Sequence, residues 1–403
     1  MLLCDETPCQ RRTQFSLGMI IVFVFDQYDD NNNGTTVSMR RFVEQLRLLG
    51  NEVRVLSTGK EEQFKYNCPV WKAKFGLKWA ERIITSQGMV FGYGKEDIVR
   101  QAFTGADVVH FIFPLGIAIG ALKVALDMKI PFTAAFHTQP ENIVYTIHME
   151  KLGFLKDYIY HMFYRRFYKH SHFIHCPTEF IASELRRTGY KDCDLRVISN
   201  GVHPIFVPTK VERFPEYANK KIVLSIGRYS REKRHDVAIR ACAQSKYAKD
   251  IVLILAGKGV MEHKHRELAA KLGVQVIWGI YTPEELVRII NMADIYVHPA
   301  DAEIEAIACI EAFSCGIVPI ISNHPKSATK MFALNDKCLF DHGKPECLAE
   351  KMDYWFDHPE EKGEMSKEYI EYAKNFQIRN SAKKMEQMFQ DAIVYYHNLY
   401  ATN

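Results

Sequence analysis

The sequence lacks the features that mark membrane-spanning, disulfide-rich or metal-binding proteins. Its ten cysteines include no Cys-x-x-Cys pair and no dense framework, which argues against disulfide and metal sites and favours reduced cytosolic thiols. The longest apolar run, residues 108–122, is shorter than the roughly 20 residues of a membrane-spanning helix, and it contains His110 and Pro114. We therefore expect no transmembrane helix.

A strong charge of one sign is also missing. The formal net charge is +4, and the small excess of Lys and Arg lies in the N-terminal half. This is too little for a nucleic-acid-binding protein, although it would suit weak attraction to anionic lipid headgroups. Residues 1–18 have no apolar core of a signal peptide, so we expect an N-terminal extension and a cytoplasmic location.

What the sequence does contain is a repeated strand and helix pattern. At 403 residues the chain is long enough for two domains. Residues 19–25 are β-branched and aromatic with no helical period, which predicts a buried strand; a helix over 37–49 and a strand over 52–57 follow. This is a βαβ unit, and it predicts a doubly wound parallel α/β domain over residues 19–205. Its further strands are expected at 108–113, 132–136, 173–175 and 195–199.

The second half repeats this pattern after a Gly- and Pro-containing connection at residues 200–208. We expect a second Rossmann-like domain over 206–380, facing the first across a central cleft. The sequence then turns helical over 346–356 and 360–400, and the last part, 381–403, is expected to cross back to the first domain. The expected strands of this half are 221–226, 251–256, 274–278, 295–298 and 318–321.

Two cations follow the first strand of the second half. Parallel sheets bind ligands beyond the carboxyl ends of their strands, where Arg228 and Lys233 stand five positions apart. Such a pair can clamp a diphosphate and stabilise the charge that develops on a departing nucleoside diphosphate. A solvated surface turn is the competing interpretation, because Arg and Lys are common in loops.

Two acidic residues follow the strand at 295–298. Glu303 and Glu311 are eight positions apart, which places them on one side of a helix that we expect to begin near Ile304. An acidic residue in such a helix can accept hydrogen bonds from ribose hydroxyls, and the amides at the helix start can face a hydroxyl-rich or anionic ligand. The helix is apolar nearly all round, so a carboxylate buried there needs a partner.

Two positions in the first half are further candidates. His137 follows the strand at 132–136, at the sheet's carboxyl edge, although a lone histidine is more often structural. Gly34, in the loop after the first strand, lets backbone approach a ligand closely. That loop has no Gly-x-Gly-x-x-Gly, so a dinucleotide site there is not expected.

Taken together, these features resemble the retaining GT-B glycosyltransferases. The resemblance rests on two Rossmann-like domains, an Arg-x4-Lys and a Glu-x7-Glu in that order, and it runs from about Met19 to the C-terminal helix. The segments FHTQPE, HCPTEFI, ISNGV, GRYSREK, EIEAIACIEA and GIVPII are especially similar to the branch with bacterial cholesterol α-glucosyltransferases and, more distantly, diacylglycerol glucosyltransferases.

The resemblance implies a role for each candidate. The sequence departs from the family pattern at two places: Ile304-Glu305-Ala306 replaces the usual Pro-Phe-Gly, and His203 replaces an Asp after Asn-Gly-Val. The first departure bears on the identity of the sugar. By resemblance, Arg228 and Lys233 hold the donor diphosphate, and Gly34 makes room for its phosphates. Glu311 binds the ribose, and the base lies against the loop around Ile280. The donor sugar is bound by Glu303 and by the backbone of Glu305, Ala306 and Ile307, and His137 contacts the sugar near its reacting face.

The implied reaction moves a hexose, with glucose from UDP-glucose expected, to the hydroxyl of a membrane lipid such as a sterol or diacylglycerol. The product is an α-glycoside, and the leaving phosphate itself takes the acceptor's proton. No cofactor or metal is expected, since cationic side chains replace the metal and the nucleotide sugar is a substrate.

Two stretches, 65–79 and 151–173, interleave aromatic residues with Lys, Arg and His, as interfacial helices do. Core packing also explains many of these rings. The pattern predicts peripheral attachment to the anionic inner face of the cell membrane. The candidate acceptor or membrane residues are Asp26, Trp71, Lys72, Lys74, Lys78, Trp79, Arg165, Arg166 and Lys169.

Two alternatives remain open. One is a transferase that acts on a soluble or polyprenyl-linked saccharide in cell-surface polysaccharide assembly. The other is a noncatalytic nucleotide-sugar-binding protein, against which the presence of the Arg, the Lys and both glutamates argues.

Overall fold

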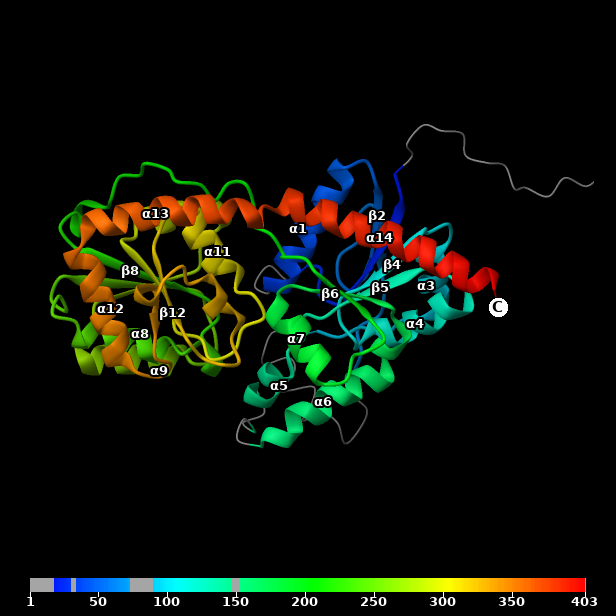
Figure 1. The fold of residues 1–403 in the computed structure, drawn as a ribbon, viewed down its shortest axis with the longest axis horizontal. Coiled ribbons are helices and arrows are strands. Elements are labelled where there is room, and N and C mark those ends of the chain that lie inside the picture. Colours follow the sequence, from blue (N-terminus) through cyan, green and yellow to red (C-terminus); the bar gives the residue numbers. More distant parts are fainter. Residues whose placement is uncertain (1–17, 30–33, 73–89, 147–148, 150–151, 403) are drawn as a thin grey trace, which may run out of the picture.

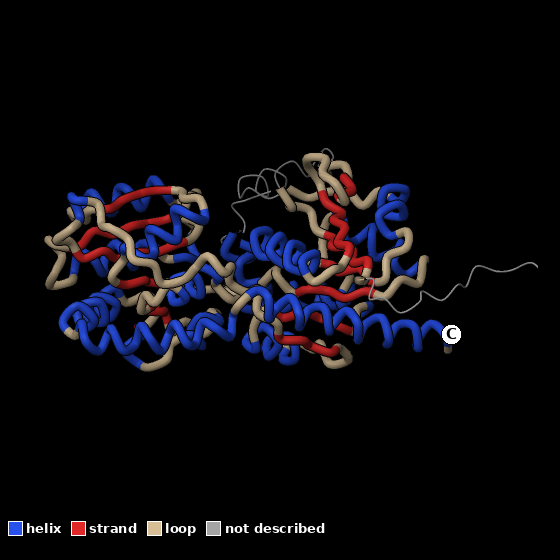
Figure 2. Tube along the Cα trace, turned by 90° about the horizontal axis from the view of Figure 1, so that it is seen from above, coloured by secondary structure: helices blue, strands red, loops and turns tan. Residues whose placement is uncertain are grey.

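A computed structural model describes residues 18–29, 34–72, 90–146, 149 and 152–402. Two α/β units lie side by side along the long axis (Figure 1). Each is built on one parallel sheet, so the predicted architecture of two Rossmann-like domains is confirmed. Turned by 90°, the strands lie between helices, and the C-terminal helix runs along the N-terminal domain (Figure 2).

The N-terminal sheet has seven strands in the order β3-β2-β1-β4-β5-β6-β7, all parallel. Its central strands are apolar and buried, as strands covered by helices on both faces must be. The strands are β1 (Ile20–Val24), β2 (Glu52–Ser57), β3 (Lys65–Asn67), β4 (Val108–Phe111), β5 (Phe132–Ala135), β6 (Phe173–Cys176) and β7 (Asp194–Val197).

Helices connect these strands and cover the sheet. The first, α1, begins at the loop after β1, so its first turn lies at the carboxyl edge of the sheet. The helices are α1 (Gly34–Leu48), α3 (Glu96–Phe103), α4 (Ile117–Asp127), α5 (Pro140–Thr146), α6 (Gly153–Arg166), the short η1 (Tyr168–His170) and α7 (Glu179–Arg187).

The C-terminal sheet has six parallel strands in the order β10-β9-β8-β11-β12-β13. Its strands are β8 (Lys221–Ile226), β9 (Ile251–Ala256), β10 (Val276–Gly279), β11 (Ile295–His298), β12 (Pro319–Ser322) and β13 (Leu339–Phe340). Its helices are η3 (Arg231–Lys233), α8 (His235–Gln244), α9 (Glu262–Leu272), α10 (Pro283–Met292), α11 (Ile307–Ser314), α12 (Pro345–Asp357) and α13 (Pro359–Ala373).

The last helix, α14 (Ile378–Ala401), joins the core of the first domain, where Met385, Met388 and Phe389 are fully buried. The continuous helix expected over 360–400 is wrong, because the short η6 (Lys374–Phe376) and an extended Gln377 separate α13 from α14. At this break the backbone of Val202 pairs with Phe376 and Ile378, so the two crossings between the domains lie together.

Two local expectations also need correction. The helix expected near Ile304 begins at Ile307, because Ala306 adopts a left-handed conformation (φ 61°) and Glu303 pairs with Ser327 as an isolated bridge. Glu303 and Glu311 therefore do not share a helix face. The interfacial helix expected over 65–79 is wrong at its start, where β3 is a strand; Lys74, Lys78 and Trp79 lie outside the described residues.

Within the described part of the chain, no helix combines the length and apolar character needed to cross a bilayer. The cysteines of that part are all free thiols.

Candidate active site

The diphosphate candidates follow β8 and differ in their surroundings. The Arg228 side chain is 47% exposed and lies 3.6 Å from Glu232, so it is available to a ligand. Lys233 ends η3 and points inward, where its Nζ forms an ion pair with Glu303 Oε1. Arg228 is thus accessible to solvent, whereas the charge of Lys233 is already paired with Glu303.

Glu303 is buried and held by a chain of polar groups. Its Oε1 lies 3.0 Å from His298 Nε2, and His298 Nδ1 lies 2.9 Å from the Tyr296 hydroxyl. Burial alone would raise the pKa of this carboxyl, but Lys233 and His298 outweigh it and lower the pKa of Glu303 to about 2. A ligand hydroxyl at this position therefore meets an ionised carboxylate.

Glu311 has a partner that the sequence pattern did not reveal. Arg41 of α1 reaches across from the N-terminal domain, with its Nη2 2.7 Å from Glu311 Oε1 and both side chains about nine-tenths buried. Arg41 Nη1 is also buried and has no hydrogen-bond partner among the described residues. The only sequence signal was position: Arg41 stands about two helical turns after Gly34, on the helix that begins at the candidate phosphate loop.

Three other contacts join the domains beside this pair. Thr178 donates a hydrogen bond to the Ile304 carbonyl (2.9 Å), and Gln139 donates one to the Lys326 carbonyl (3.0 Å). The Asn200 amide donates to Glu305 Oε2 (2.9 Å). The segments FHTQPE, HCPTEFI and ISNGV therefore meet the C-terminal domain at the cleft.

Glu305 is 2% exposed, and burial raises its pKa to about 7 from an ordinary 4.5, even though Ser199 and Asn200 donate hydrogen bonds to it. Because the pKa of Glu305 is raised in the folded state, this carboxyl contributes to the free energy of unfolding fully below about pH 4.5, and the contribution is lost as the pH rises through about 7.

Glu305→Gln has no carboxyl at this position, so its free energy of unfolding lacks this pH-dependent contribution. We expect the difference in free energy of unfolding between variant and wild type, measured by urea unfolding, to change in favour of the variant by on the order of 3 kcal/mol as the pH is raised from about 4.5 to 8. A pH-independent difference would contradict this.

His137 lies just beyond β5 and is 6% exposed. Its ring centroid is 5.1 Å from that of His175, which in turn lies 6.1 Å from that of His110. Burial first, and then these two neighbouring rings, hold the pKa of His137 well below its usual range. The ring is thus neutral and can serve a ligand as a hydrogen-bonding group, not as a cation.

The remaining donor candidates lie at the ends of strands or the starts of helices. Gly34 is the first residue of α1, and a Cβ added there would meet no atom within 4 Å. Ile280 follows β10 with 61% of its surface exposed. Ala306 and Ile307 form the start of α11. Arg41 and Glu311 join the two domains beside these elements, and the donor-binding roles of Gly34, Ile280, Ala306 and Ile307 stay predictions.

The acceptor and membrane candidates divide. Asp26 is 1% exposed and accepts hydrogen bonds from the amides of Gly92 (2.6 Å) and Ile117 (3.0 Å), so it cannot contact a membrane surface, and its role as an acceptor residue stays a prediction. Burial raises its pKa to about 6. Trp71 is 37% exposed. Lys72, Arg165, Arg166 and Lys169 are also exposed.

The chain is similar to known sugar transferases. A model described as Glycosyltransferase Family 4 matches residues 32–205, and one described as Glycosyl transferases group 1 matches residues 207–376. Alpha-monoglucosyldiacylglycerol synthase of Streptococcus pneumoniae is 23% identical over 324 residues, covering 74% of this chain and 70% of the relative.

Solved structures are similar as well. The catalytic domain of cholesterol-alpha-glucosyltransferase from Helicobacter pylori is 44% identical and covers 39% of this chain and 99% of its own, with a TM-score of 0.37. HepE of Anabaena, solved with UDP and glucose, is 14% identical and covers 93% of this chain and all of its own, with a TM-score of 0.69. The second likeness shows a shared fold over nearly the whole chain.

Proposed function

Because the chain belongs to the GT-B glycosyltransferases, we propose that it is a retaining transferase that moves glucose from UDP-glucose to the hydroxyl of a membrane lipid. The observation that carries the donor half is the cleft cluster itself. Lys233 pairs with an ionised Glu303, the half-exposed Arg228 lies on the same loop, and Glu311 is held by Arg41. Cations for a diphosphate and carboxylates for hydroxyls are the groups that a nucleotide sugar requires.

In the proposed reaction the bond between the sugar's anomeric carbon and the diphosphate breaks while a bond from the acceptor oxygen forms on the same face. The acceptor's proton passes to the departing phosphate oxygen, so no carboxylate nucleophile is needed. Arg228 and Lys233 stabilise the charge that grows on this phosphate, and Glu303 accepts a hydrogen bond from a sugar hydroxyl. Neutral His137 contacts the sugar near its reacting face.

Two observations support a lipid acceptor. The curated relative is named as a synthase of a glucosyl diacylglycerol. The lower helix α6 in Figure 1 also carries exposed Phe154 (71%) and Tyr158 (64%) at one end and exposed Arg165 and Arg166 at the other. Exposed rings and cations on one helix suit the interface of an anionic bilayer.

The donor and acceptor are tested in one assay. With UDP-glucose and dispersed diacylglycerol or sterol, the full chain should release UDP and form an α-glucoside, identified by proton NMR, in excess EDTA because side-chain cations take the metal's role. A β-glucoside would contradict retention. Loss of turnover in EDTA, restored by Mg²⁺ or Mn²⁺, would contradict metal independence, and UDP-glucose binding without any turnover would indicate a noncatalytic protein.

Membrane binding is tested with matched charge changes. Replacing Arg165, Arg166 and Lys169 together by Gln should weaken binding to anionic vesicles by on the order of 100-fold, since each cation near such a surface contributes about 1 kcal/mol. The effect should fade at high salt. UDP binding should be unchanged, because the donor cations lie in the other domain.

The matched control replaces three other exposed cations of the same domain, Lys123, Lys383 and Lys384, by Gln. Lys383 and Lys384 belong to α14, and Figure 1 shows that helix on the opposite side of the domain from α6. Equal vesicle binding by the two triple variants, or no binding by the wild type, would contradict the lipid proposal and favour a soluble saccharide acceptor.

A further inference from the structure

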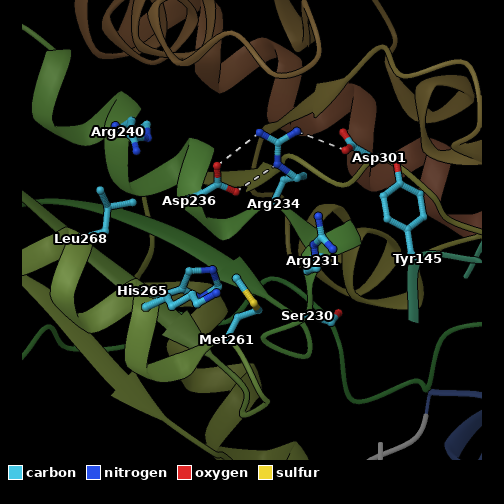
Figure 3. Close-up of a pocket in the computed structure, with 11 residues that line it drawn as sticks. Tyr145, Ser230, Arg231, Arg234, Asp236, Arg240, Met261, His265, Leu268 and Asp301 are labelled. Atoms are coloured by element: carbon cyan, nitrogen blue, oxygen red, sulfur yellow. Dashed lines mark hydrogen bonds and ion pairs between the residues drawn. The ribbon is translucent and has the colours of Figure 1, made fainter. Parts of the chain in front are cut away.

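A cavity of about 540 Å³ lies next to the diphosphate loop, walled by α8 and α9 of the C-terminal domain and by Tyr145 of α5 (Figure 3). Its lining includes Ser230 and Arg231 but neither Lys233 nor Glu303, so it is separate from the donor cluster. Its volume falls within the range of roughly 300–1,000 Å³ that is typical of small-molecule sites.

Arg234 forms one wall of this cavity in a strained conformation. It is left-handed (φ 52°), which is costly for a residue with a Cβ, and it caps α8. Its guanidinium holds both carboxylates of the lining: Asp236 at 3.0 and 3.2 Å and Asp301 at 3.1 Å, as Figure 3 shows. Arg234 therefore offsets one of the two negative charges that these carboxylates carry.

The other cations of the lining add positive charge that these carboxylates do not balance. Arg240 of α8 and Lys264 of α9 are exposed, and neither forms a hydrogen bond or ion pair with any residue of the described ranges. A cavity in which cations outnumber the available carboxylates attracts an anion, and arginine is well suited to phosphate oxygens.

The same cavity has an apolar side. Met261 and Leu268 of α9 and the ring of Tyr145 line it together with the cations. Inorganic phosphate alone would leave the side chains of Met261 and Leu268 uncovered. The ligand that fits is a phosphate ester whose organic group covers it.

We propose that this cavity is a second anion site, which binds a phosphate ester and thereby holds the η3 turn next to the donor. Consecutive residues link the two sites: Lys233 pairs with Glu303 in the donor cluster, and Arg234 pairs with Asp301 in the cavity wall. The ester is supplied either by a soluble phosphate monoester or by a phospholipid headgroup. Binding at this site does not require the proposed transferase reaction.

The test uses the full chain with saturating UDP, so that the donor site is filled. Calorimetry with glycerol 3-phosphate, and sedimentation with phosphatidylglycerol or phosphatidylcholine vesicles, are compared between two double variants. Arg240→Gln with Lys264→Gln removes the two exposed cations of the cavity that α8 and α9 supply. Lys249→Gln with Lys271→Gln makes the same charge change at exposed positions of the same domain outside the cavity.

The cavity variant should bind at least about tenfold more weakly than the control, because two charge-assisted contacts are lost. If the cavity variant binds glycerol 3-phosphate more weakly than the control does, the ligand is a soluble ester. If its binding is weakened only for phosphatidylglycerol vesicles, the ligand is a lipid headgroup. Absence of binding by the wild type to every probe, or equal binding by the two variants, would overturn the proposal. A failure of UDP itself to bind would count against the proposed donor and not against this site.

Discussion

Arg228→Ala should lower kcat by on the order of 100-fold while leaving the free energy of unfolding almost unchanged. The half-exposed guanidinium lies 3.6 Å from Glu232, so the folded state loses only a weak surface contact when it is removed. The transition state loses a charge-assisted hydrogen bond to the departing diphosphate, which strengthens as charge develops. Steady-state kinetics and urea unfolding measure the two effects separately.

Lys233→Ala should show a comparable loss in kcat together with a loss of stability. Removing this lysine leaves the buried, ionised Glu303 with His298 as its remaining polar partner, which we expect to cost about 2 kcal/mol. Lys271→Ala, at an exposed position of α9, is the control. Wild-type turnover in both cation variants would remove the diphosphate assignment.

Arg41→Ala should weaken donor binding by about tenfold at neutral pH and shift the pH dependence of binding to higher pH than in the wild type. Burial raises the pKa of Glu311, and Arg41 opposes that rise. Without the guanidinium the buried carboxyl takes up a proton and can no longer accept hydrogen bonds from both ribose hydroxyls. We therefore expect affinity for UDP to recover partly as the pH is raised. Breaking the buried pair should also cost about 3 kcal/mol of stability.

The control for this prediction is Arg40→Ala, the neighbouring position on α1, whose guanidinium lies over the ring of Tyr28 instead of reaching Glu311. A double-mutant cycle with Glu311→Gln measures the coupling of the pair. If Arg41→Ala binds UDP as tightly as wild type at every pH, then Glu311 does not bind the donor's ribose through this pair. A pH-independent loss would indicate that Arg41 acts only on domain closure.

The elements that could be predicted are those specified by local patterns. The strands at 52–57, 221–226, 251–256 and 295–298 are confirmed with the same bounds. A run of β-branched residues that is buried on both faces leaves few alternatives to a central parallel strand. Element ends were less predictable, since the start of α11 depends on the left-handed Ala306 and on the pairing of Glu303 with Ser327.

For the candidate site, too, some features could be predicted from the sequence and others could not. The sequence by itself determined which chemical groups stand at the carboxyl ends of the strands, because strand order and chain direction place Arg228, Lys233 and Glu303 at one sheet edge. Only the tertiary structure decided which group each of them faces. No spacing reveals either pair: Lys233 meets Glu303 because β8 and β11 are neighbours in the C-terminal sheet, and Arg41 meets Glu311, 270 positions away, because the two domains pack together. Burial and the neighbouring cations together set the pKa of each carboxyl, and both are properties of the folded chain.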